Sequence, residues 1–434
     1  MTLQNATSGP GNLKSFKVSS NKNGKDLDLS AGVVDYRYYE NIMSNYITAS
    51  ATVIETGNTT NDVINAIDGL PLRGGEKIDV VVEDVQGNQI VVPEGLYISR
   101  VRNADPSSLQ ELYQIDLASK EYFLNEHSRV VKRYEGNISG NIEEILNDVL
   151  KSTGKIEIDP TGNSYNFMGN TRKPFYICTW LASRSIPPST GKNSGPGGFL
   201  FFQTRDGLHF KSIDNLFSKK PFKRFIMNDT GLPVAGYDGN IRSYSIQSDI
   251  DMNLNQTIGA YNNRTVFFDY FNMCYKEIEF SIENASDSIT SAGRHYINVN
   301  DEFIKKPTRH LYYIKDIGTN PQGTGNQQLD NWKSDPTRQN FDSEQVLVQS
   351  IMRYNQLFTV QTNVVIDGDF SIRAGDIIEC DFPELEANVN KGKNPQSGGI
   401  YMVGSVCHKV TPRETFTSLG LIRDSFGKKT GIAN

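Results

Sequence analysis

The sequence predicts a mainly β protein with α+β insertions, in which two similar antiparallel β-barrel domains flank a middle α/β region. Three observations lead to this fold class: a β-type segment that occurs near both ends of the chain, short apolar runs separated by turn residues, and a helical pattern between the two copies. The predicted domains are a first barrel (1–120), an α+β middle domain (121–235), a β-rich connection and peripheral insertion that can add strands to the second barrel (236–340), and the second barrel with a C-terminal tail (341–434).

The repeat consists of three short matches in the same order. Leu72–Ile78 returns as Ile372–Ile378 with an offset of 300 residues, and Gly95–Ile98 returns as Gly399–Met402 with an offset of 304. Upstream, Ala51–Ile54 resembles Asn363–Ile366 with an offset of 312. A glycine and an acidic residue before a strand are common turn chemistry, so one match alone carries little weight. Three ordered matches favour a duplication, in which residues 45–118 superpose on 358–424 and Gly75 and Gly375 occupy equivalent turns.

Residues 13 to 120 show strands and turns. Ile78–Glu83 and Ile90–Val92 flank the turn Val85–Gln89, a hairpin pattern, and Tyr46–Ile54 is rich in β-branched residues and partly alternating. A small antiparallel barrel or sandwich fits this pattern.

The next stretch is helical. Apolar residues at helical spacing predict an amphipathic helix that Asn141 caps and Gly154 ends: Ile142, Ile145, Leu146, Val149 and Leu150. Glu143 and Glu144 point about 100° apart on a helix, so they are expected to be solvated rather than a catalytic pair. A second helix is predicted from Pro174, with Phe175, Cys178 and Leu181 facing inward and Trp180 buried beside them.

A loop over 189–198 leads into a hairpin. The loop contains Gly191-Lys192, but Asn193 follows, a strand comes next and Pro196 removes an amide donor, which argues against nucleotide binding. Phe199–Ile213 then gives two apolar strands around an Asp206-Gly207 turn, and Ile213–Phe217 closes this unit.

Two charged segments suggest other functions, which we reject. The run Lys219, Lys220, Lys223 and Arg224 alternates with Phe222 and Phe225, a pattern known from single-strand nucleic-acid binding, but in an acidic chain a solvated strand edge is the better interpretation. Asp249–Asn253 opens like a calcium loop, yet Leu254 stands where the turn needs glycine and Ala260 where the bidentate glutamate belongs.

The last part of the chain returns to strands. They are expected over 241–280, followed by a polar loop at Gly318–Asp330, and 345–426 holds the second copy of the repeat, which a polar loop interrupts at 386–398.

Composition predicts a soluble globular protein whose partners are proteins. The 434 residues carry a formal net charge of −6, 37% are hydrophobic, and neither a secretory signal nor an apolar span long enough for a membrane is visible. Production in a cytoplasm is therefore expected. Cys178, Cys274, Cys380 and Cys407 are widely spaced, which predicts reduced and mostly packed thiols rather than disulfides or zinc ligands.

No catalytic centre is visible in the sequence. The five histidines lie in separate elements, without Ser, Cys or carboxylate at a known motif spacing: His127, His209, His295, His310 and His408. We therefore expect no enzyme, with no catalytic, metal or cofactor-binding residues and no cofactor, although a constellation assembled only by the fold escapes this search. His408 is expected to be a hydrogen-bonded strand residue.

Three segments together resemble a known family: the terminal β repeats, Gly198–Phe217, and Ser397–Val410. They resemble the baseplate central hub proteins of contractile-tailed (myovirus-type) bacteriophages. That resemblance implies two tube-type barrels in each subunit and a homotrimer whose six barrels form a ring. Such a ring joins the sixfold tail tube, or a tube-initiator protein, to the threefold spike.

The resemblance also implies other baseplate proteins at the periphery and a place in the virion after assembly in the host cytoplasm. The acidic net charge and the absence of a long apolar run predict no specific nucleic-acid binding and no membrane insertion. Two alternatives stay open. A tail-associated cell-wall-degrading enzyme needs an acid and a base or nucleophile in a cleft. A carbohydrate-binding adhesin needs exposed aromatic residues on loops, and Trp180 and Trp332 are the only tryptophans.

Overall fold

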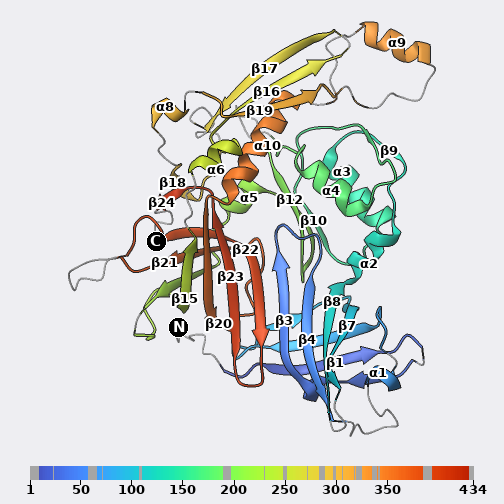
Figure 1. Ribbon diagram of the computed structural model, residues 1–434, viewed down its shortest axis with the longest axis vertical. Helices are drawn as coiled ribbons and strands as arrows, with labels where there is room; N and C mark the ends of the chain where they lie inside the picture. Colours follow the sequence, from blue (N-terminus) through green and yellow to red (C-terminus); the bar gives the residue numbers. More distant parts are fainter. Residues whose placement is uncertain are drawn as a thin grey trace.

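The computed structural model describes residues 9–22, 24–56, 66–70, 72–106, 110–188, 197–228, 230–247, 252–270, 272–282, 289–296, 300–304, 306–316, 318, 325–334, 340, 343–384 and 393–429. Two β-barrels lie side by side at one end of the molecule (Figure 1). An α+β unit adjoins them, and an insertion with its own small sheet forms the opposite end. The mainly β fold class predicted from the sequence is confirmed.

The first barrel is formed by β1 (Asn12–Ser19), β2 (Asp26–Asp28), the 3₁₀ turn η1 (Ser30–Gly32), β3 (Val33–Asn41), β4 (Thr48–Glu55), α1 (Ala66–Gly69), β5 (Lys77–Glu83), β6 (Gln89–Val91), β7 (Leu96–Pro106) and β8 (Glu111–Ser119). Neighbouring strands follow the order β2-β1-β5-β7-β8-β4-β3 and are all antiparallel, with β6 beside β5. Alternate residues face one core, as in β4, whose burial alternates along the whole strand.

The second barrel is formed by β14 (Lys223–Met227), β15 (Gly239–Gln247), β20 (Val360–Asp367), β21 (Ile377–Asp381), β22 (Gly399–Val410) and β23 (Thr415–Arg423). Its strand order is β22-β21-β14-β15-β20-β23, and β23 pairs with β22 to close a six-stranded ring. Because β3 also pairs with β22, both barrels belong to one 14-stranded sheet.

The two barrels repeat each other strand for strand. In chain order β1, β3, β4, β5, β7 and β8 correspond to β14, β15, β20, β21, β22 and β23, and the pairings among them recur with one exception. β14 pairs with β15, whereas β1 and β3 are not paired in the described part of the chain. Irregularities recur too: β7 has a bulge between Ile98 and Arg100, and β22 has one between Val403 and Ser405. Gly75 and Gly375 have φ of +83° and +86°, and their amides bond to the carbonyls of Ile98 and Val403 at 2.7 and 2.8 Å. The duplication and the equivalence of these turns are confirmed.

The backbone pairing corrects two of the three predicted offsets by one residue. Ile78 faces Leu96 and Ile378 faces Tyr401, so the offset in this strand is 305 and not 304. Likewise, Ala51 corresponds to Val364, which makes the offset there 313 and not 312. A slip of one residue in a strand exchanges its buried and exposed faces, so the pairing distinguishes the two alignments sharply.

β14 departs from the prediction in two ways. It lies within the predicted middle domain, but it is a strand of the second barrel between β21 and β15. It also runs parallel to both neighbours, so this barrel is not wholly antiparallel. The reason is that the chain enters β14 directly from the adjoining unit, at the end of the barrel opposite to the one expected from the first copy.

The middle unit contains α2 (Lys120–His127), β9 (Arg133–Tyr134), α3 (Ile138–Glu144), the π-helical η2 (Ile145–Val149), β10 (Ile156–Ile158), β11 (Phe167–Met168), α4 (Pro174–Ala182), β12 (Phe199–Thr204), β13 (Gly207–Ser212) and α5 (Ile213–Ser218). The predicted helix begins at Ile138, not at Asn141, because Asn137 is the cap and its Oδ1 accepts from the Ser139 amide at 3.0 Å. It ends at Val149, before Gly154. The helix at Pro174 and the hairpin at Asp206-Gly207 lie where they were predicted.

The insertion between β15 and β20 contains α6 (Met252–Thr257), β16 (Asn262–Asp269), β17 (Cys274–Ser281), β18 (Gly293–His295), α8 (Asp301–Ile304), β19 (Arg309–Ile314), α9 (Gly325–Ser334) and α10 (Ser343–Leu357). β17, β16 and β19 form a small sheet, and β18 pairs with β24 (Phe426–Lys428). Helix α9 replaces part of the predicted loop at Gly318–Asp330. Residues 345–357 are helical, so the second barrel copy resumes only at Val360. Within the described ranges, no helix has the length and apolarity to cross a membrane.

Candidate functional site

The feature that sets the geometry of this molecule is the junction between its two barrels. β3 lies antiparallel to the second half of β22, from Asn41 opposite Ser405 to Tyr36 opposite Val410. β21 pairs only with the first part of β22, from Gly399 to Met402, so β3 takes the edge that β21 leaves. The barrels are therefore joined by backbone hydrogen bonds of a continuous sheet, which hold them more rigidly than a linker would.

A loop of the second barrel, residues 368–376, inserts into this junction. Phe370 is fully buried and belongs to the core of the first barrel, although its chain neighbours belong to the second copy. Its ring meets the His408 ring edge to face at 5.1 Å between centroids. Separating the barrels would therefore expose a large apolar side chain, so the loop acts as a wedge that fixes their relative orientation.

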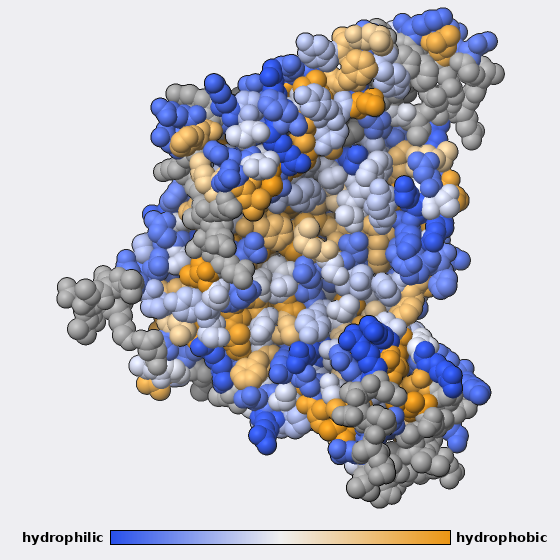
Figure 2. Space-filling view, viewed as in Figure 1, coloured by the Kyte–Doolittle hydropathy of each residue, from blue (hydrophilic) through white to orange (hydrophobic). Residues whose placement is uncertain are grey.

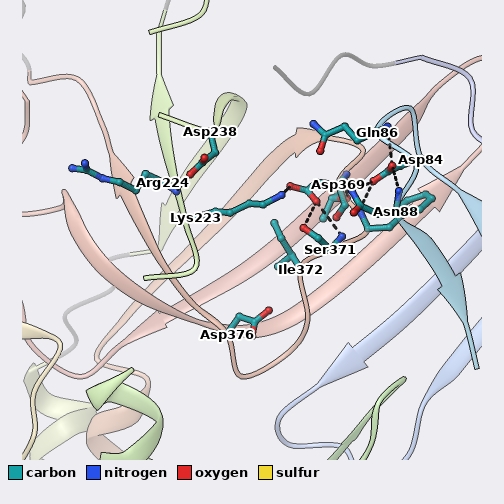
Figure 3. A network of polar contacts seen from close by, with 12 residues as sticks. Asp84, Gln86, Asn88, Lys223, Arg224, Asp238, Asp369, Ser371, Ile372 and Asp376 are labelled. Atoms are coloured by element: carbon teal, nitrogen blue, oxygen red, sulfur yellow. Dashed lines mark hydrogen bonds and ion pairs between the residues drawn. The ribbon is translucent and has the colours of Figure 1, made fainter. Parts of the chain in front are cut away.

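Asp84 binds this loop from the first barrel. Its carboxylate accepts from the Phe370 amide at 3.0 Å and from the amides of Gln86 and Asn88 at 2.9 and 2.8 Å. Figure 3 shows Asp84 and Asn88 facing Asp369 and Ser371 across the junction. Asp84 is buried, so removing the carboxylate would leave several amides without a partner.

Asp369 binds the same loop to β14. Its side chain forms an ion pair with Lys223 and accepts from the Ser371 amide at 3.0 Å (Figure 3). Arg224 forms an ion pair with Glu379 on β21, with 2.9 Å between Nε and Oε2. The predicted strand edge is wrong, because Lys223 and Arg224 belong to an interior strand and have carboxylate partners. Lys223 is half-buried, whereas Arg224 is exposed to solvent as predicted. Lys219 and Lys220, just before that strand, are exposed.

Glu40 joins three segments at one point. Its carboxylate accepts from the backbone amides of Arg205 at 2.8 Å and Ala374 at 3.0 Å, and from the Tyr38 hydroxyl at 2.8 Å. Burial raises the pKa of Glu40 despite these donors. The middle unit, the first barrel and the wedge loop are thus held together by one carboxylate that water does not reach.

His408 is a buried strand residue of this junction. Its Nδ1 lies 3.0 Å from the Thr417 hydroxyl and its Nε2 lies 3.2 Å from the Ile372 carbonyl, which confirms the expectation of a hydrogen-bonded histidine. Its ring stacks on Tyr38. Burial is the main cause that lowers the pKa of His408 to about 3, so the ring is neutral at physiological pH.

A second buried cluster fixes the insertion to the end of the second barrel. Arg353 of α10 is 1% exposed and forms ion pairs with Asp424, which follows β23, and with Asp214 of α5. Its guanidinium also donates to the Thr290 carbonyl at 2.8 Å. Burial raises the pKa of Asp214. Insertion, barrel and middle unit thus meet at a single buried arginine.

The fold creates one arrangement of catalytic type that the sequence search missed. Thr204 Oγ1 lies 2.8 Å from His209 Nε2, and His209 Nδ1 lies 3.3 Å from the Glu157 carboxylate. The three residues come from β12, β13 and β10, whose pairing alone brings them together, so spacing in the sequence carried no signal. Thr204 is 2% exposed, and burial, the main cause, lowers the pKa of His209 to about 4. The threonine hydroxyl is therefore enclosed by protein.

The three remaining histidines lie apart from one another. His127, His295 and His310 are exposed on separate elements. Among the described residues, no three His, Cys, Asp or Glu side chains converge in a way that could hold a metal ion. All four cysteines are free, with Cys178 and Cys380 buried, Cys407 half-buried and Cys274 exposed. Of the loop 189–198 considered for nucleotide binding, the structure describes only Gly197 and Gly198. Of the segment considered for calcium binding, Asp249–Asp251 lie outside the described residues, Met252, Asn253 and Leu254 begin helix α6, and Ala260 is buried.

Aromatic residues also lie on the surface of the middle unit and of the insertion. A pocket of about 350 Å³ in the middle unit is lined by Trp180, Tyr176 and Arg172, and Trp180 is half-buried rather than buried as predicted. Figure 2 shows apolar residues at the outer end of the insertion. On the small sheet of the insertion, Phe268 pairs across to Tyr275 and Ile314, and all three are exposed on one face.

Comparison with solved structures gives the same fold in two tail proteins. The tail protein of Neisseria meningitidis MC58 aligns with a TM-score of 0.52 and 10% identity over 94% of this chain and 97% of its own. The 43 kDa tail protein of prophage MuSo2 from Shewanella oneidensis aligns with a TM-score of 0.52 and 8% identity over 95% and 98%. The sequence matches no described protein family and no curated protein. At this identity the likeness establishes a shared fold.

Proposed function

We propose that this chain is the structural hub of a contractile-tail baseplate: a homotrimeric ring in the virion that joins the sixfold tail tube, or a tube-initiator protein, to a threefold central spike. The carrying observation is the duplication of a six-stranded barrel within one chain, with the two copies joined by β3 and β22. Three such chains supply six similar barrels, so a threefold ring presents a nearly sixfold surface. The fold shared with two tail proteins supports the same assignment.

The rigidity of the junction supports this role. An adaptor between two symmetries has to keep its barrels at a constant angle while the tail contracts. The wedge residue Phe370 and the buried carboxylates Asp84 and Glu40 provide such a constraint. The small sheet of the insertion lies away from the barrels, and its exposed apolar face around Phe268 suits contacts with other baseplate proteins at the periphery.

Light scattering on the purified chain, followed by electron-microscopy class averages, tests this proposal. We expect the mass of three chains and a closed ring with six similar lobes around a channel. A chain that stays monomeric at high concentration, or a closed ring without six similar lobes, would contradict the hub assignment.

We further propose that the hub has no catalytic activity. The arrangement Thr204-His209-Glu157 is the strongest support for the alternative of a cell-wall-degrading enzyme, but the buried threonine favours a structural role. Zymography against peptidoglycan distinguishes the two. Clearing by the natural chain that is lost in Thr204→Val would overturn the structural assignment, whereas the hub predicts no clearing by either protein.

The aromatic pocket favours carbohydrate binding as a second candidate function. Trp180 and the 52% exposed Tyr176 offer ring faces to a ligand, and Arg172 lies over the Tyr176 ring. A glycan array tests this adhesin. Binding that Tyr176→Ala abolishes would support it, and an array without signal would argue against the adhesin.

A further inference from the structure

We propose that the subunits of the ring are joined by the free edges of β15 and β7, which pair between neighbouring chains in the way that β3 and β22 pair within one chain. The inference rests on the proposed ring, and it names the partner of each edge: β15 of one copy binds β7 of the next copy. It follows from the internal repeat, because a ring of similar barrels needs similar junctions.

The first step is the equivalence of β15 with β3. Tyr36 faces Ala51 on β4, and Tyr244 faces Val364, the counterpart of Ala51, on β20. Both strands carry a bulge at the same place, between Val33 and Asp35 in β3 and between Ile241 and Ser243 in β15. The residues before and after each bulge therefore give the same offset of 208 residues between β3 and β15. A slip of one residue in register is excluded.

The second step is the equivalence of β7 with β22 at an offset of 305. The shared bulge after Ile98 and Val403 fixes it, and Val101 faces Ile115 as Val406 faces Leu419. The part of β22 that β3 binds, from Ser405 onward, thus corresponds to the part of β7 from Arg100 onward.

The third step is that the corresponding edges are open in this chain. β5 pairs with β7 only through Leu96 and Tyr97, and in the described part of the chain no strand lies beside the remaining β7 residues on that side. β14 likewise pairs with β15 only up to Ile241, and no described strand continues along that edge. Such edges attract other strands unless a partner covers them.

The two edges are also placed for a head-to-tail contact. β15 and β7 lie on opposite sides of the barrel pair (Figure 1). Ser243, Tyr244 and Ser245 on β15 are exposed, whereas their equivalents Asp35, Tyr36 and Arg37 include the fully buried Tyr36. A contact between unlike patches that repeats by rotation generates a closed ring.

The equivalence predicts individual pairs. Cys407 faces Tyr39 within the chain, so Arg102 should face Gln247 of the neighbouring copy. His408 faces Tyr38, so Asn103 should face Ile246. Beyond Asn103, β7 has a second bulge that β22 lacks, and Pro106 offers no amide, so the pairing should be short. The bulge and the proline thus leave only a short stretch of β7 for pairing with a strand of another chain.

Disulfide cross-linking tests this register. The test variant carries Arg102→Cys and Gln247→Cys in a Cys274→Ser background, which removes the exposed thiol. Directly opposed strand residues have Cα separations of about 4.5–5.5 Å, within the range that a disulfide spans. After oxidation, we expect covalent dimers and trimers on a non-reducing gel.

Two matched variants complete the test. Tyr39→Cys in the same background places a thiol opposite the natural Cys407. It should give a disulfide within one chain, so the protein should still run as a single chain on the non-reducing gel. Arg102→Cys with Ser243→Cys moves one thiol by four residues, about 13 Å along the strand, and should give few interchain products.

The outcomes separate the two proposals. If light scattering finds trimers and Tyr39→Cys forms its disulfide, yet the Arg102 and Gln247 thiols do not link chains, the edge pairing is wrong and the ring stands. Equal cross-linking by the off-register pair would also overturn the register. A chain that is monomeric by light scattering and forms no interchain products contradicts both the ring and its interface.

Discussion

The two barrels have the same six strands in the same order, but one strand of the second barrel runs in the opposite direction. β1 is antiparallel to β5, whereas its counterpart β14 is parallel to β21. Both strands still place a phenylalanine opposite the same position of the neighbouring strand. Phe16 faces Val80, and Phe225 faces Cys380, which is the counterpart of Val80 at the offset of 300 residues. Both rings are fully buried or nearly so. The same core position is thus filled by a phenylalanine in both barrels, although the strands that carry it run in opposite directions.

The barrels also differ in what they carry. β3 and β4 are joined directly by residues 42–47, whereas the equivalent strands β15 and β20 are separated by the whole insertion. In consequence the second barrel needs the buried Arg353 cluster to hold the insertion, and the end of the first barrel makes neutral contacts, such as the 2.6 Å bond from Ser119 to Gln203. A duplicated barrel can therefore diverge at its connections while its strand register is kept.

The largest expected effect tests the equivalence of the two phenylalanines. Phe16→Ala and Phe225→Ala should each lower the free energy of unfolding by about 3–5 kcal/mol, because each leaves a cavity in a closed core. Urea unfolding followed by circular dichroism measures both losses. If one substitution were nearly neutral, the reversed strand would not be packed as its counterpart is, and the comparison would fail at that strand.

The next effect sharpens the difference between the two equivalent turns. Both glycines have positive φ, so an alanine at either position is forced into the left-handed region. Gly75→Ala should therefore lower the free energy of unfolding by about 1–2 kcal/mol. Gly375→Ala should lower the free energy of unfolding by about 1–3 kcal/mol more than Gly75→Ala does. The reason is that its Cβ would lie 3.0 Å from the Phe202 ring, whereas the nearest atom to a Cβ at Gly75 lies at 3.7 Å. Equal losses in thermal unfolding would show that the two turns have the same surroundings.

Much of the repeat could be predicted from the sequence where local chemistry demands particular residues. Each turn needs a glycine at positive φ and an acidic side chain, since Glu76 and Asp376 accept from the amides of Arg73 and Arg373. The match over Leu72–Ile78 was therefore correct. In the strands, many apolar residues serve equally well, so sequence similarity alone chose alignments one residue away from the true pairing.

The junction was not predictable, because its residues have no local signature. Asp84 looks like a turn residue and Glu40 like a strand-end charge, and their partners lie 286 and 334 residues away in the chain. Phe370 likewise could be placed in a core but not in the core of the other barrel. The only available signal was a concentration of acidic residues beside apolar ones, as in Asp367–Phe370, which does not identify a partner.

A smaller effect distinguishes the barrels by pH. His408 corresponds to Asn103 in the first barrel, so the second barrel alone carries a titratable group there. The pKa of His408 falls from 6.5 to about 3 on burial, so its contribution to stability is full above pH 6.5 and is lost as the pH falls towards 3. At pH 5 the loss is about 2 kcal/mol.

Substitution isolates this contribution from other titrating groups. His408→Asn, which copies the residue of the first barrel, should unfold with a weaker pH dependence between 7.5 and 5 than the natural chain. The difference between the two pH profiles, measured by urea unfolding, should approach about 2 kcal/mol at pH 5. Parallel profiles would mean that the folded protein accommodates the charged imidazole.

The smallest effect leaves stability unchanged and uses the natural thiols as reporters. Four thiols should titrate after denaturation without reductant, as the free cysteines require, and fewer would contradict the structure. In the native chain, Cys274 should react first and Cys407 slowly, because burial raises the pKa of the Cys407 thiol. Cys178 in the middle unit and Cys380 in the second barrel are fully buried and should react only on unfolding.

The order in which these last two thiols react then reports how the parts of the molecule are coupled. The wedge loop and the Arg353 cluster join the second barrel to the middle unit through buried contacts, so the two should open together and Cys178 and Cys380 should become reactive at the same urea concentration. A lower midpoint for Cys380 would mean that the second barrel opens while the middle unit stays folded. In that case the junction would be weaker than its buried carboxylates suggest, and the two barrels would not act as one rigid body in a ring.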